Sequence, residues 1–115
     1  MKNIVDKSLF ETDEHTRKMV ALIVEHYSPE RVYLFGSKAR GDSGPDSDYD
    51  FLVVVRRKVP RAKKDKFVDK RWKARLFEAT DVVIWTKKSF EELSHLRTSL
   101  PATVIEEGKL LYDAA

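Results

Sequence analysis

The sequence predicts a single α/β domain, residues 1–115, in which helices flank a small mixed β-sheet. Three observations lead to this prediction. The 115 residues match the usual size of one domain. The runs 50–55 and 80–86 are rich in β-branched and aromatic residues, which is typical of strands. Segments with apolar residues at helical spacing alternate with these runs, as they do in an α/β fold.

The first predicted element is a helix over residues 12–27, which Thr12 or Asp13 can cap. The serine–proline pair after it ends the helix, because the residue before a proline avoids the helical region. A short strand over residues 31–35 follows. A polar stretch over residues 38–49 then leads into the apolar run 50–55, which predicts a central strand covered on both faces.

Residues 64–79 predict a basic helix with one apolar stripe. The members of that stripe are Phe67, Trp72, Leu76 and Ala79. Trp72 and Trp85 are both expected to be buried or half-buried packing residues.

The last third of the chain predicts a strand, two helices and a final strand. Residues 80–86 form the strand, and a capping box from Ser89 to Glu92 opens a helix that ends near residue 97. A further helix over 99–107 carries a proline in its first turn and a glycine just past its end, and a short strand over 109–112 closes the domain.

Composition and charge narrow the function classes. Hydrophobic residues make up 42% of the chain, which excludes a disordered polymer. No apolar run approaches the roughly 20 residues of a membrane helix, and the first residues lack the apolar stretch of a secretory signal. The absence of cysteine excludes disulfides, thiolate catalysis and cysteine zinc sites. We therefore expect a cytoplasmic protein with no membrane partner.

Positive charge is concentrated in residues 56–75. This segment holds eleven basic and two acidic residues, a net charge of +9 in a chain whose total is +3. Such a block favours an acidic partner surface or a polyanion. A solvated, highly charged helix and loop would explain it equally well.

The chemistry is concentrated between residues 35 and 50. Gly36 and Ser37 follow a predicted strand, and a helical turn beginning at Ser37 would direct its free N–H groups and hydroxyl to one point, which suits a phosphate. Lys38 and Arg40 would add positive charge there. By itself, a glycine after a strand also fits an ordinary turn.

Three aspartates form the second part of the pattern. Asp48 and Asp50 lie two positions apart, so on a strand they would share one face, where a divalent cation such as Mg²⁺ relieves their repulsion. Asp81 begins another strand and would join them if the two strands are neighbours. The alternative is that the pair is a polar strand entry and that Asp81 lies at the solvent end of its strand.

Together these residues resemble the nucleotidyltransferase superfamily that includes DNA polymerase beta. Its pattern is a hydrophobic-Gly-Ser turn, a spacer, Asp-x-Asp on a strand and a third carboxylate on a further strand. The segments 35–41 and 47–51 are close to the minimal, single-domain branch of the superfamily, the minimal nucleotidyltransferases or MNT domains. The segment 104–112 also looks like the end of that branch.

The resemblance implies a role for each residue. Gly36 and Ser37 would hold the triphosphate of ATP or another nucleoside triphosphate. Asp48, Asp50 and Asp81 would be the catalytic carboxylates and would bind two Mg²⁺ ions. Asp81 would also orient or deprotonate the attacking hydroxyl. The product would carry a nucleotidyl group, AMP in the simplest case.

The resemblance also implies a partner. Minimal nucleotidyltransferases commonly accompany a small helical HEPN-domain toxin, act as its antitoxin, and in some cases transfer AMP to its tyrosine. The basic 56–75 segment would then be the docking face. Two other functions stay open: a catalytically silent antitoxin that neutralises its partner by contact, and a nucleic-acid-binding protein that uses the basic segment. A homo-oligomer is also compatible with the sequence.

Overall fold

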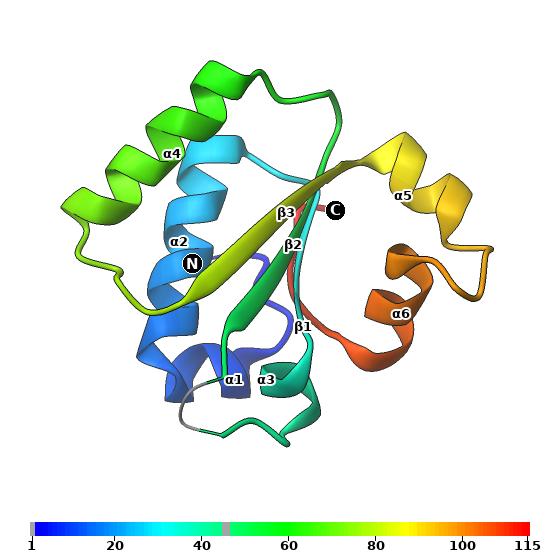
Figure 1. Ribbon diagram of the computed structural model, residues 1–115, viewed down its shortest axis with the longest axis horizontal. Helices are drawn as coiled ribbons and strands as arrows, with labels where there is room; N and C mark the ends of the chain where they lie inside the picture. Colours follow the sequence, from blue (N-terminus) through cyan, green and yellow to red (C-terminus); the bar gives the residue numbers. More distant parts are fainter. Residues whose placement is uncertain (1, 45–46) are drawn as a thin grey trace.

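The computed structural model describes residues 2–44 and 47–115, in which helices lie on both faces of a four-stranded sheet (Figure 1). Residues 45 and 46 of the predicted polar stretch are outside the described residues. The helices are α1 (Lys7–Thr12), α2 (Glu14–Tyr27), α3 (Ser37–Arg40), α4 (Arg61–Lys73), α5 (Lys87–Leu93) and α6 (Leu100–Glu107). The strands are β1 (Arg31–Phe35), β2 (Tyr49–Val55), β3 (Thr80–Thr86) and β4 (Lys109–Asp113).

The sheet is mixed, as predicted, with strand order β3-β2-β1-β4. β2 pairs parallel with β3 and antiparallel with β1, and β1 pairs antiparallel with β4. The prediction of a central strand over 50–55 is confirmed, because β2 lies inside the sheet and every residue from Phe51 to Val55 is buried. The edge strands are therefore β3 and β4, and residues 3–5 hydrogen-bond along the outer edge of β4.

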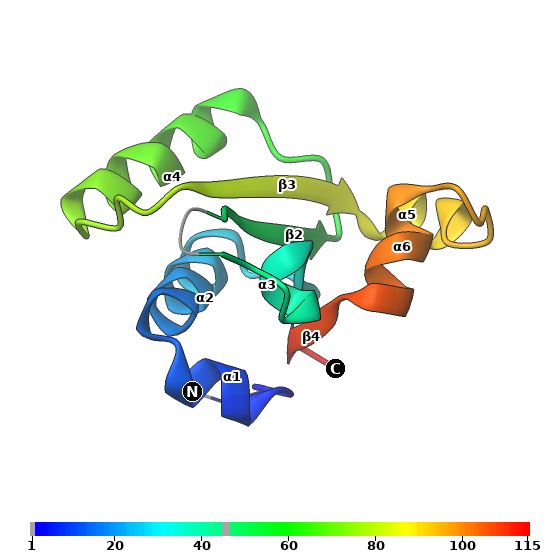
Figure 2. The ribbon, with the colours of Figure 1, turned by 60° about the horizontal axis from the view of Figure 1, so that its bottom comes forward.

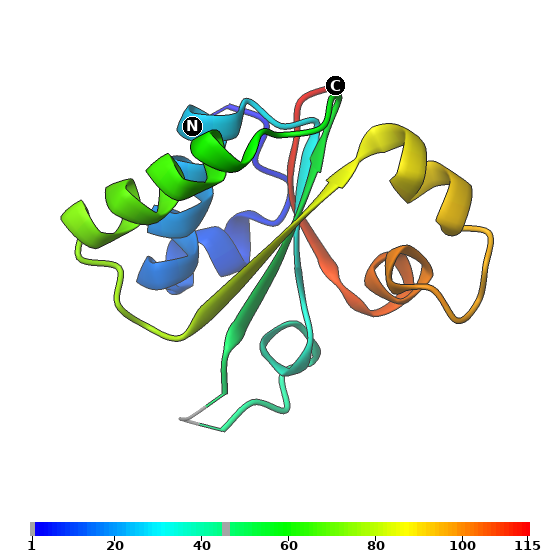
Figure 3. The same cartoon turned by 45° about the horizontal axis from the view of Figure 1, so that its top comes forward.

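Helices cover the two faces of the sheet separately. α1, α2 and α4 lie on one face and α5 and α6 on the other, as the nearly edge-on view in Figure 3 shows. Alternate residues of each strand serve the two faces. On β2, Phe51, Val53 and Val55 pack toward α2, whereas Leu52 and Val54 pack with Phe90 and Val104 from the α5–α6 side.

The N-terminal region contains one helix that the sequence did not predict. α1 ends at Thr12, and Asp13 then caps α2 by accepting a hydrogen bond from the Thr16 amide at 3.4 Å. The predicted cap at Asp13 is thus confirmed, while the predicted helix start at residue 12 is two residues too early. α1 is short and has no buried residue, so its hydrophobic signal is weak.

The basic helix differs most from the prediction. It covers Arg61–Lys73 rather than 64–79. Pro60 precedes its first turn, where a proline is tolerated because the first N–H groups have no acceptor within the helix. Arg75 has φ +58°, a left-handed conformation that stops the helix before the predicted end.

The predicted apolar stripe of this helix is also wrong. Phe67 is the buried residue of α4, whereas Trp72 is 65% exposed and Ala79 is exposed. Leu76 is buried but lies beyond the helix end. Trp85, by contrast, is half-buried as expected.

The C-terminal elements match the prediction in type and order, but α5 ends at Leu93 rather than near residue 97. α5 begins at Lys87 rather than Ser89, because Thr86 is its cap and accepts a hydrogen bond from the Ser89 amide at 3.2 Å. Ser99 caps α6, and Gly108 follows its last residue. Within the described residues, no helix combines the length and the apolar composition needed to cross a membrane.

Candidate active site

Three chain segments meet at one end of the sheet. β1 ends there, and β2 and β3 begin there because they run parallel (Figure 1). The strand pairing places Asp50 opposite Phe35 on one side and opposite Asp81 on the other. Strand alternation directs Asp50 and Asp81 to the α5–α6 face of the sheet. Two carboxylates predicted from separate segments therefore lie side by side on neighbouring strands.

Gly36 brings the end of β1 against Asp50. Its φ is +75°, and a Cβ atom at this position would lie 2.5 Å from Oδ2 of Asp50. Both the backbone conformation and the close approach require the absence of a side chain. The carboxylate of Asp50 is thus in contact with the Gly36 backbone, which makes the glycine part of the site.

The predicted helical turn after Gly36 is present as α3. The carbonyl of Gly36 accepts hydrogen bonds from the amides of Ala39 and Arg40, both at 3.1 Å. Ser37 is therefore the first residue of the turn, directly beside the glycine that contacts Asp50. Gly41, with φ +81°, ends the turn.

The site carries concentrated negative charge. Burial raises the pKa of the Asp50 carboxyl, and the charges of Asp81 and Asp48 raise this pKa further. Asp48 precedes the first residue of β2 and is exposed, as is Asp81. The charges of Asp48 and Asp81 therefore both act on the Asp50 carboxylate, and a cation bound there would relieve the repulsion among the three.

The donor set of the site suits a hard divalent cation. Carboxylate oxygens are the protein ligands that Mg²⁺ prefers, and Mg²⁺ usually takes only one or two of them, with waters and substrate phosphates completing its shell. In residues 2–44 and 47–115, no group of three or more histidine, cysteine or acidic side chains is arranged to hold a metal ion. The residues that could hold such a cation together with a substrate phosphate are Asp50 and its neighbours Asp48 and Asp81.

The two predicted cations lie at the margin of the site. The Nζ atom of Lys38 lies 4.6 Å from the ring centroid of Tyr49, a cation–π contact. Arg40 is paired with Asp42, with 3.2 Å between Nε and Oδ2, on the exposed surface. Neither side chain contacts Asp48, Asp50 or Asp81. The structure therefore brings together Gly36, Ser37 and these three carboxylates, but not the side chains of Lys38 and Arg40.

A hydrogen-bond network behind the site was not predicted. The Tyr49 hydroxyl donates to both carboxylate oxygens of Asp13, at 3.1 and 2.9 Å. His15 packs against Tyr49 with ring centroids 4.4 Å apart and a 51° angle between the ring planes, and its Nε2 hydrogen-bonds to the Thr80 hydroxyl at 2.7 Å. The network ties the starts of β2 and β3 to the start of α2.

No sequence pattern indicated this network. Tyr49 and Asp13 are 36 residues apart, and Asp13 had a sufficient local role as a helix cap. Tyr49, at the unspecified position between Asp48 and Asp50, therefore has a structural role of its own, because it anchors the strand that carries Asp50.

An α/β domain with strand-borne carboxylates beside a Gly-Ser turn is the architecture of an enzyme that transfers phosphoryl or nucleotidyl groups. The model of the nucleotidyltransferase domain matches residues 17–111. The chain therefore belongs to the nucleotidyltransferase domain family, and the predicted resemblance is confirmed at that level. The match includes Gly36, Asp50 and Asp81.

Solved structures share the fold. A chain of a toxin–antitoxin with AMP-PNP is 21% identical, with a TM-score of 0.61 over 88% of this chain and 74% of that chain. A chain of a tri-AMPylated Shewanella oneidensis HEPN toxin in complex with MNT antitoxin is 20% identical, with a TM-score of 0.54 over 86% and 70%. A nucleotidyltransferase-like structure from Sulfolobus solfataricus is 19% identical, with a TM-score of 0.56 over 94% and 86%.

At these identities the likeness establishes the fold. No curated protein matches the sequence at a significant level. The mixed sheet with helices on both faces is thus the nucleotidyltransferase fold, as predicted, and structures of MNT-type toxin–antitoxin systems share it.

Proposed function

We propose that this chain is a Mg²⁺-dependent nucleotidyltransferase that transfers AMP from ATP to a hydroxyl group of a protein partner and releases pyrophosphate. The observation that carries the proposal is the strand pairing of Asp50 with Asp81 beside the Gly36 backbone. In-line displacement at a phosphate requires groups that hold metal ions beside the place where the phosphate binds. The pairing of the two carboxylates beside the turn fits this requirement. In this proposal, residues 1–115 act as one minimal catalytic domain in the cytoplasm.

Each site residue has a defined task. Asp48, Asp50 and Asp81 would hold the Mg²⁺ ions. When bound, these ions would neutralise phosphate charge and favour the ionised form of the attacking hydroxyl. Asp81, which is exposed on the edge strand, is open to an approaching acceptor and would orient its hydroxyl or accept its proton. Asp50, which is packed against Gly36, holds the position of the other ligands.

The Gly-Ser turn would bind the triphosphate. The first amides of α3 have no acceptor within the helix, so they can donate to phosphate oxygens, and the Ser37 hydroxyl can add a further hydrogen bond. Lys38 would leave the ring of Tyr49, and Arg40 would leave Asp42, to neutralise phosphate charge. Both side chains are close enough in sequence to the turn to do so by a change of rotamer.

The acceptor in this proposal is a tyrosine of a HEPN-type toxin, and the chain is its antitoxin. Two of the structures that share the fold support this assignment: one is a toxin–antitoxin with AMP-PNP, and the other contains a tri-AMPylated HEPN toxin with an MNT antitoxin. The first supports an adenine nucleotide and the second supports a protein acceptor.

Intact-mass measurement tests the proposal. The chain would be incubated with ATP, Mg²⁺ and a small helical HEPN-domain protein from the same genome. The partner should gain one or more AMP units, and omission of Mg²⁺ should abolish the gain. Asp50→Asn should slow the transfer by about 100-fold or more, a common loss when one charge-stabilising group is removed. Glu11→Gln, at an exposed position of α1 outside the basic 56–75 segment, is the matched control and should keep the wild-type rate.

Two results would contradict the enzyme. Equal AMP transfer by the wild type and Asp50→Asn would show that the carboxylates are not catalytic. Stable binding of the partner without any mass gain, under each nucleoside triphosphate, would instead identify a silent antitoxin that acts by contact.

A further inference from the structure

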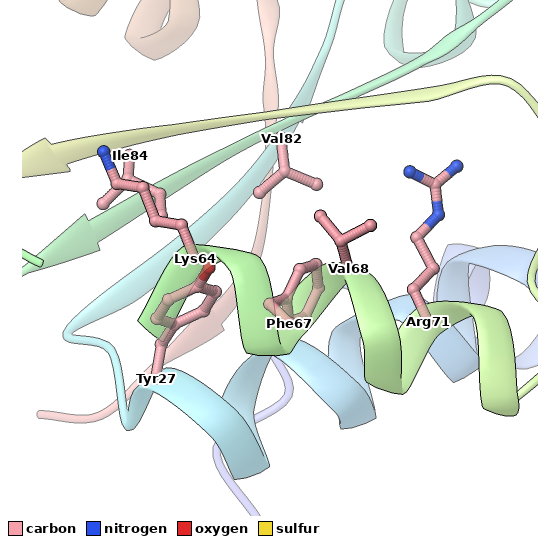
Figure 4. Close-up of a pocket in the computed structure, with 7 residues that line it drawn as sticks. All are labelled: Tyr27, Lys64, Phe67, Val68, Arg71, Val82 and Ile84. Carbon is pink, nitrogen blue, oxygen red and sulfur yellow. The ribbon is translucent and has the colours of Figure 1, made fainter. Parts of the chain in front are cut away.

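A groove lies on the face of the sheet opposite the candidate active site. It encloses about 220 Å³ between α4 and the edge strand β3 (Figure 4). Tyr27 and Phe67 lie deepest, and Val68, Val82 and Ile84 form apolar walls, as the close-up shows. Lys64 and Arg71 stand along the rim on α4.

The groove exists because α4 is only lightly attached. Phe67 is the buried residue of this helix, and it packs on Tyr27 with ring centroids 5.1 Å apart. Since β3 is an edge strand, α4 runs beside it without a further strand to fill the space (Figure 2). Val82 and Ile84 consequently remain only partly buried.

Exposed apolar side chains lie on α4 and just beyond its C-terminal end, and one of them, Val68, lines the groove. Val68 is 50% exposed, Trp72 65% and Phe77 60%. Trp72 and Phe77 contact each other with ring centroids 5.1 Å apart and a 55° angle between their planes. These two large side chains contact each other instead of packing into the core. Exposed apolar side chains that lie together are typical of a surface that binds another molecule.

The surroundings of the groove are positively charged. α4 contains seven basic and two acidic residues. Among residues 2–44 and 47–115, no basic residue of α4 forms an ion pair. Arg71 is held in place because its guanidinium donates to the carbonyls of Leu76, Glu78 and Thr80, which leaves its charge without a carboxylate partner. The groove thus combines apolar walls with uncompensated positive charge.

We propose that this groove binds an acidic amphipathic segment of a protein partner. Apolar side chains of that segment would fill the space beside Val68, Val82 and Ile84, and its carboxylates would pair with Lys64 and Arg71. Charge complementarity identifies this occupant, since an apolar segment without carboxylates would leave the basic rim unpaired. An amphipathic helix presents this pattern on one face.

Protein fits the groove better than nucleic acid does. The walls are aliphatic, and the exposed rings of Trp72 and Phe77 are tilted against each other, so they do not form the flat platform on which bases stack. Nucleic acid is therefore a competing outcome of the test.

Docking in the groove is separate from nucleotide transfer. Asp81 and Val82 are consecutive on β3 and project to opposite faces of the sheet, so an occupant of the groove does not cover the carboxylates. The inference therefore goes beyond the proposed function and does not require it. Asp50→Asn should leave binding in the groove unchanged.

The direct test uses a fluorescent synthetic peptide of about 20 residues, long enough to form a helix. The peptide carries leucine at every third or fourth position and glutamate at most others. Fluorescence anisotropy should show that it binds the wild-type chain and that affinity falls as salt rises. A peptide with lysine in place of glutamate should not bind.

Two variants and their matched controls locate the binding. Val68→Asp should weaken binding at least about tenfold, the effect of losing an apolar anchor. Ile105→Asp is its control, because Ile105 is 52% exposed on α6, away from the groove, and the change should have no effect. Lys64→Glu should also weaken binding and reduce its salt dependence, whereas Lys88→Glu on α5 should do neither.

Four results would overturn the proposal. The first is a wild-type chain that does not bind the acidic peptide at low salt. The second is equal binding by Val68→Asp and Lys64→Glu when circular dichroism shows both to be folded. The third is tighter binding of a single-stranded oligonucleotide, lost in the same variants, which would assign the surface to nucleic acid. The last is a dimer in sedimentation that Val68→Asp dissociates, which would make a second copy the occupant.

Discussion

Two regions on opposite faces of β3 are built by different means. In the candidate active site, Asp81 is held opposite Asp50 by backbone pairing, and Asp50 contacts the Gly36 backbone. In the groove, the next residue, Val82, faces α4 across a space that side chains do not fill. One region is positioned by the hydrogen bonds of the sheet. The other is positioned by the buried Phe67 and by side-chain-to-backbone hydrogen bonds of Arg71 and His26.

The difference agrees with the two tasks proposed for the molecule. Catalysis requires carboxylates placed to within a fraction of an ångström, and strand pairing supplies this precision. Recognition of a partner tolerates adjustment, and a lightly packed helix allows it. We therefore expect changes at the two regions to have separable effects, and three predictions test this expectation.

The largest effect on stability is expected at the attachment of α4. Phe67→Ala removes the buried ring of this helix and should lower the free energy of unfolding by about 3 kcal/mol, measured by urea denaturation. Trp72→Ala, on the same helix but 65% exposed, should cost about 0.5 kcal/mol or less. Equal losses in the two variants would mean that α4 is held by the Trp72 side rather than by Phe67.

A smaller effect on stability, but a larger effect on chemistry, is expected at Gly36. Gly36→Ala forces a side chain into a left-handed conformation and against Asp50, so it should cost about 2 kcal/mol and displace the carboxylate. Gly41→Ala has a similar φ but open space around it, so it should cost about 1 kcal/mol. Denaturation and the AMP-transfer assay would be run on both variants.

The informative quantity is the difference in AMP transfer between Gly36→Ala and Gly41→Ala. AMP transfer should fall sharply in Gly36→Ala and stay near the wild-type rate in Gly41→Ala. If both variants keep full transfer, the close contact of Gly36 with Asp50 does not matter for the chemistry.

The smallest effect is expected from His15, in the network that anchors the start of β2. Burial lowers the pKa of His15 from its usual value of 6.5, although the carboxylates of Glu78 and Asp13 oppose this shift. The folded chain therefore binds a proton less readily than the unfolded chain. Stability is at its full value above pH 6.5 and declines as the pH falls from 6.5 toward the lowered folded-state pKa.

Urea denaturation of the wild type and His15→Gln between pH 5 and 8 measures this dependence. As the pH rises through this range, the free energy of unfolding of the wild type should increase relative to that of His15→Gln. His95→Gln, at an exposed histidine, should follow the wild type. A constant difference between wild type and His15→Gln at all pH values would contradict the prediction.

Much of the fold and the site could be predicted because the relevant signals are local. The strands over 31–35 and 80–86 agree with the structure residue for residue, since β-branched runs bounded by polar residues define their own ends. Gly36 and Ser37 were predicted as a turn because they directly follow the strand over 31–35, which is also a local signal. The role of Asp81 depended on strand order, and the parallel pairing of β2 with β3 is what brings it beside Asp50.

The failures concern contacts between distant segments. The end of α4 depends on the left-handed Arg75 and on carbonyls that Arg71 binds, and the helical pattern does not contain this information. The bond between Tyr49 and Asp13 joins residues 36 positions apart. Trp72 was expected to be buried or half-buried because it is large and apolar, but it packs only beside Phe77 and is 65% exposed.

By itself, the sequence determined the class of fold and the residues capable of the chemistry, because strand propensity, a glycine turn and carboxylate spacing are properties of short segments. The tertiary structure alone decided which carboxylates meet, how Tyr49 is anchored and that a basic apolar groove lies behind the acidic site. These features depend on the order and direction of the strands and on how closely one helix packs. Such relations exist only in the folded chain.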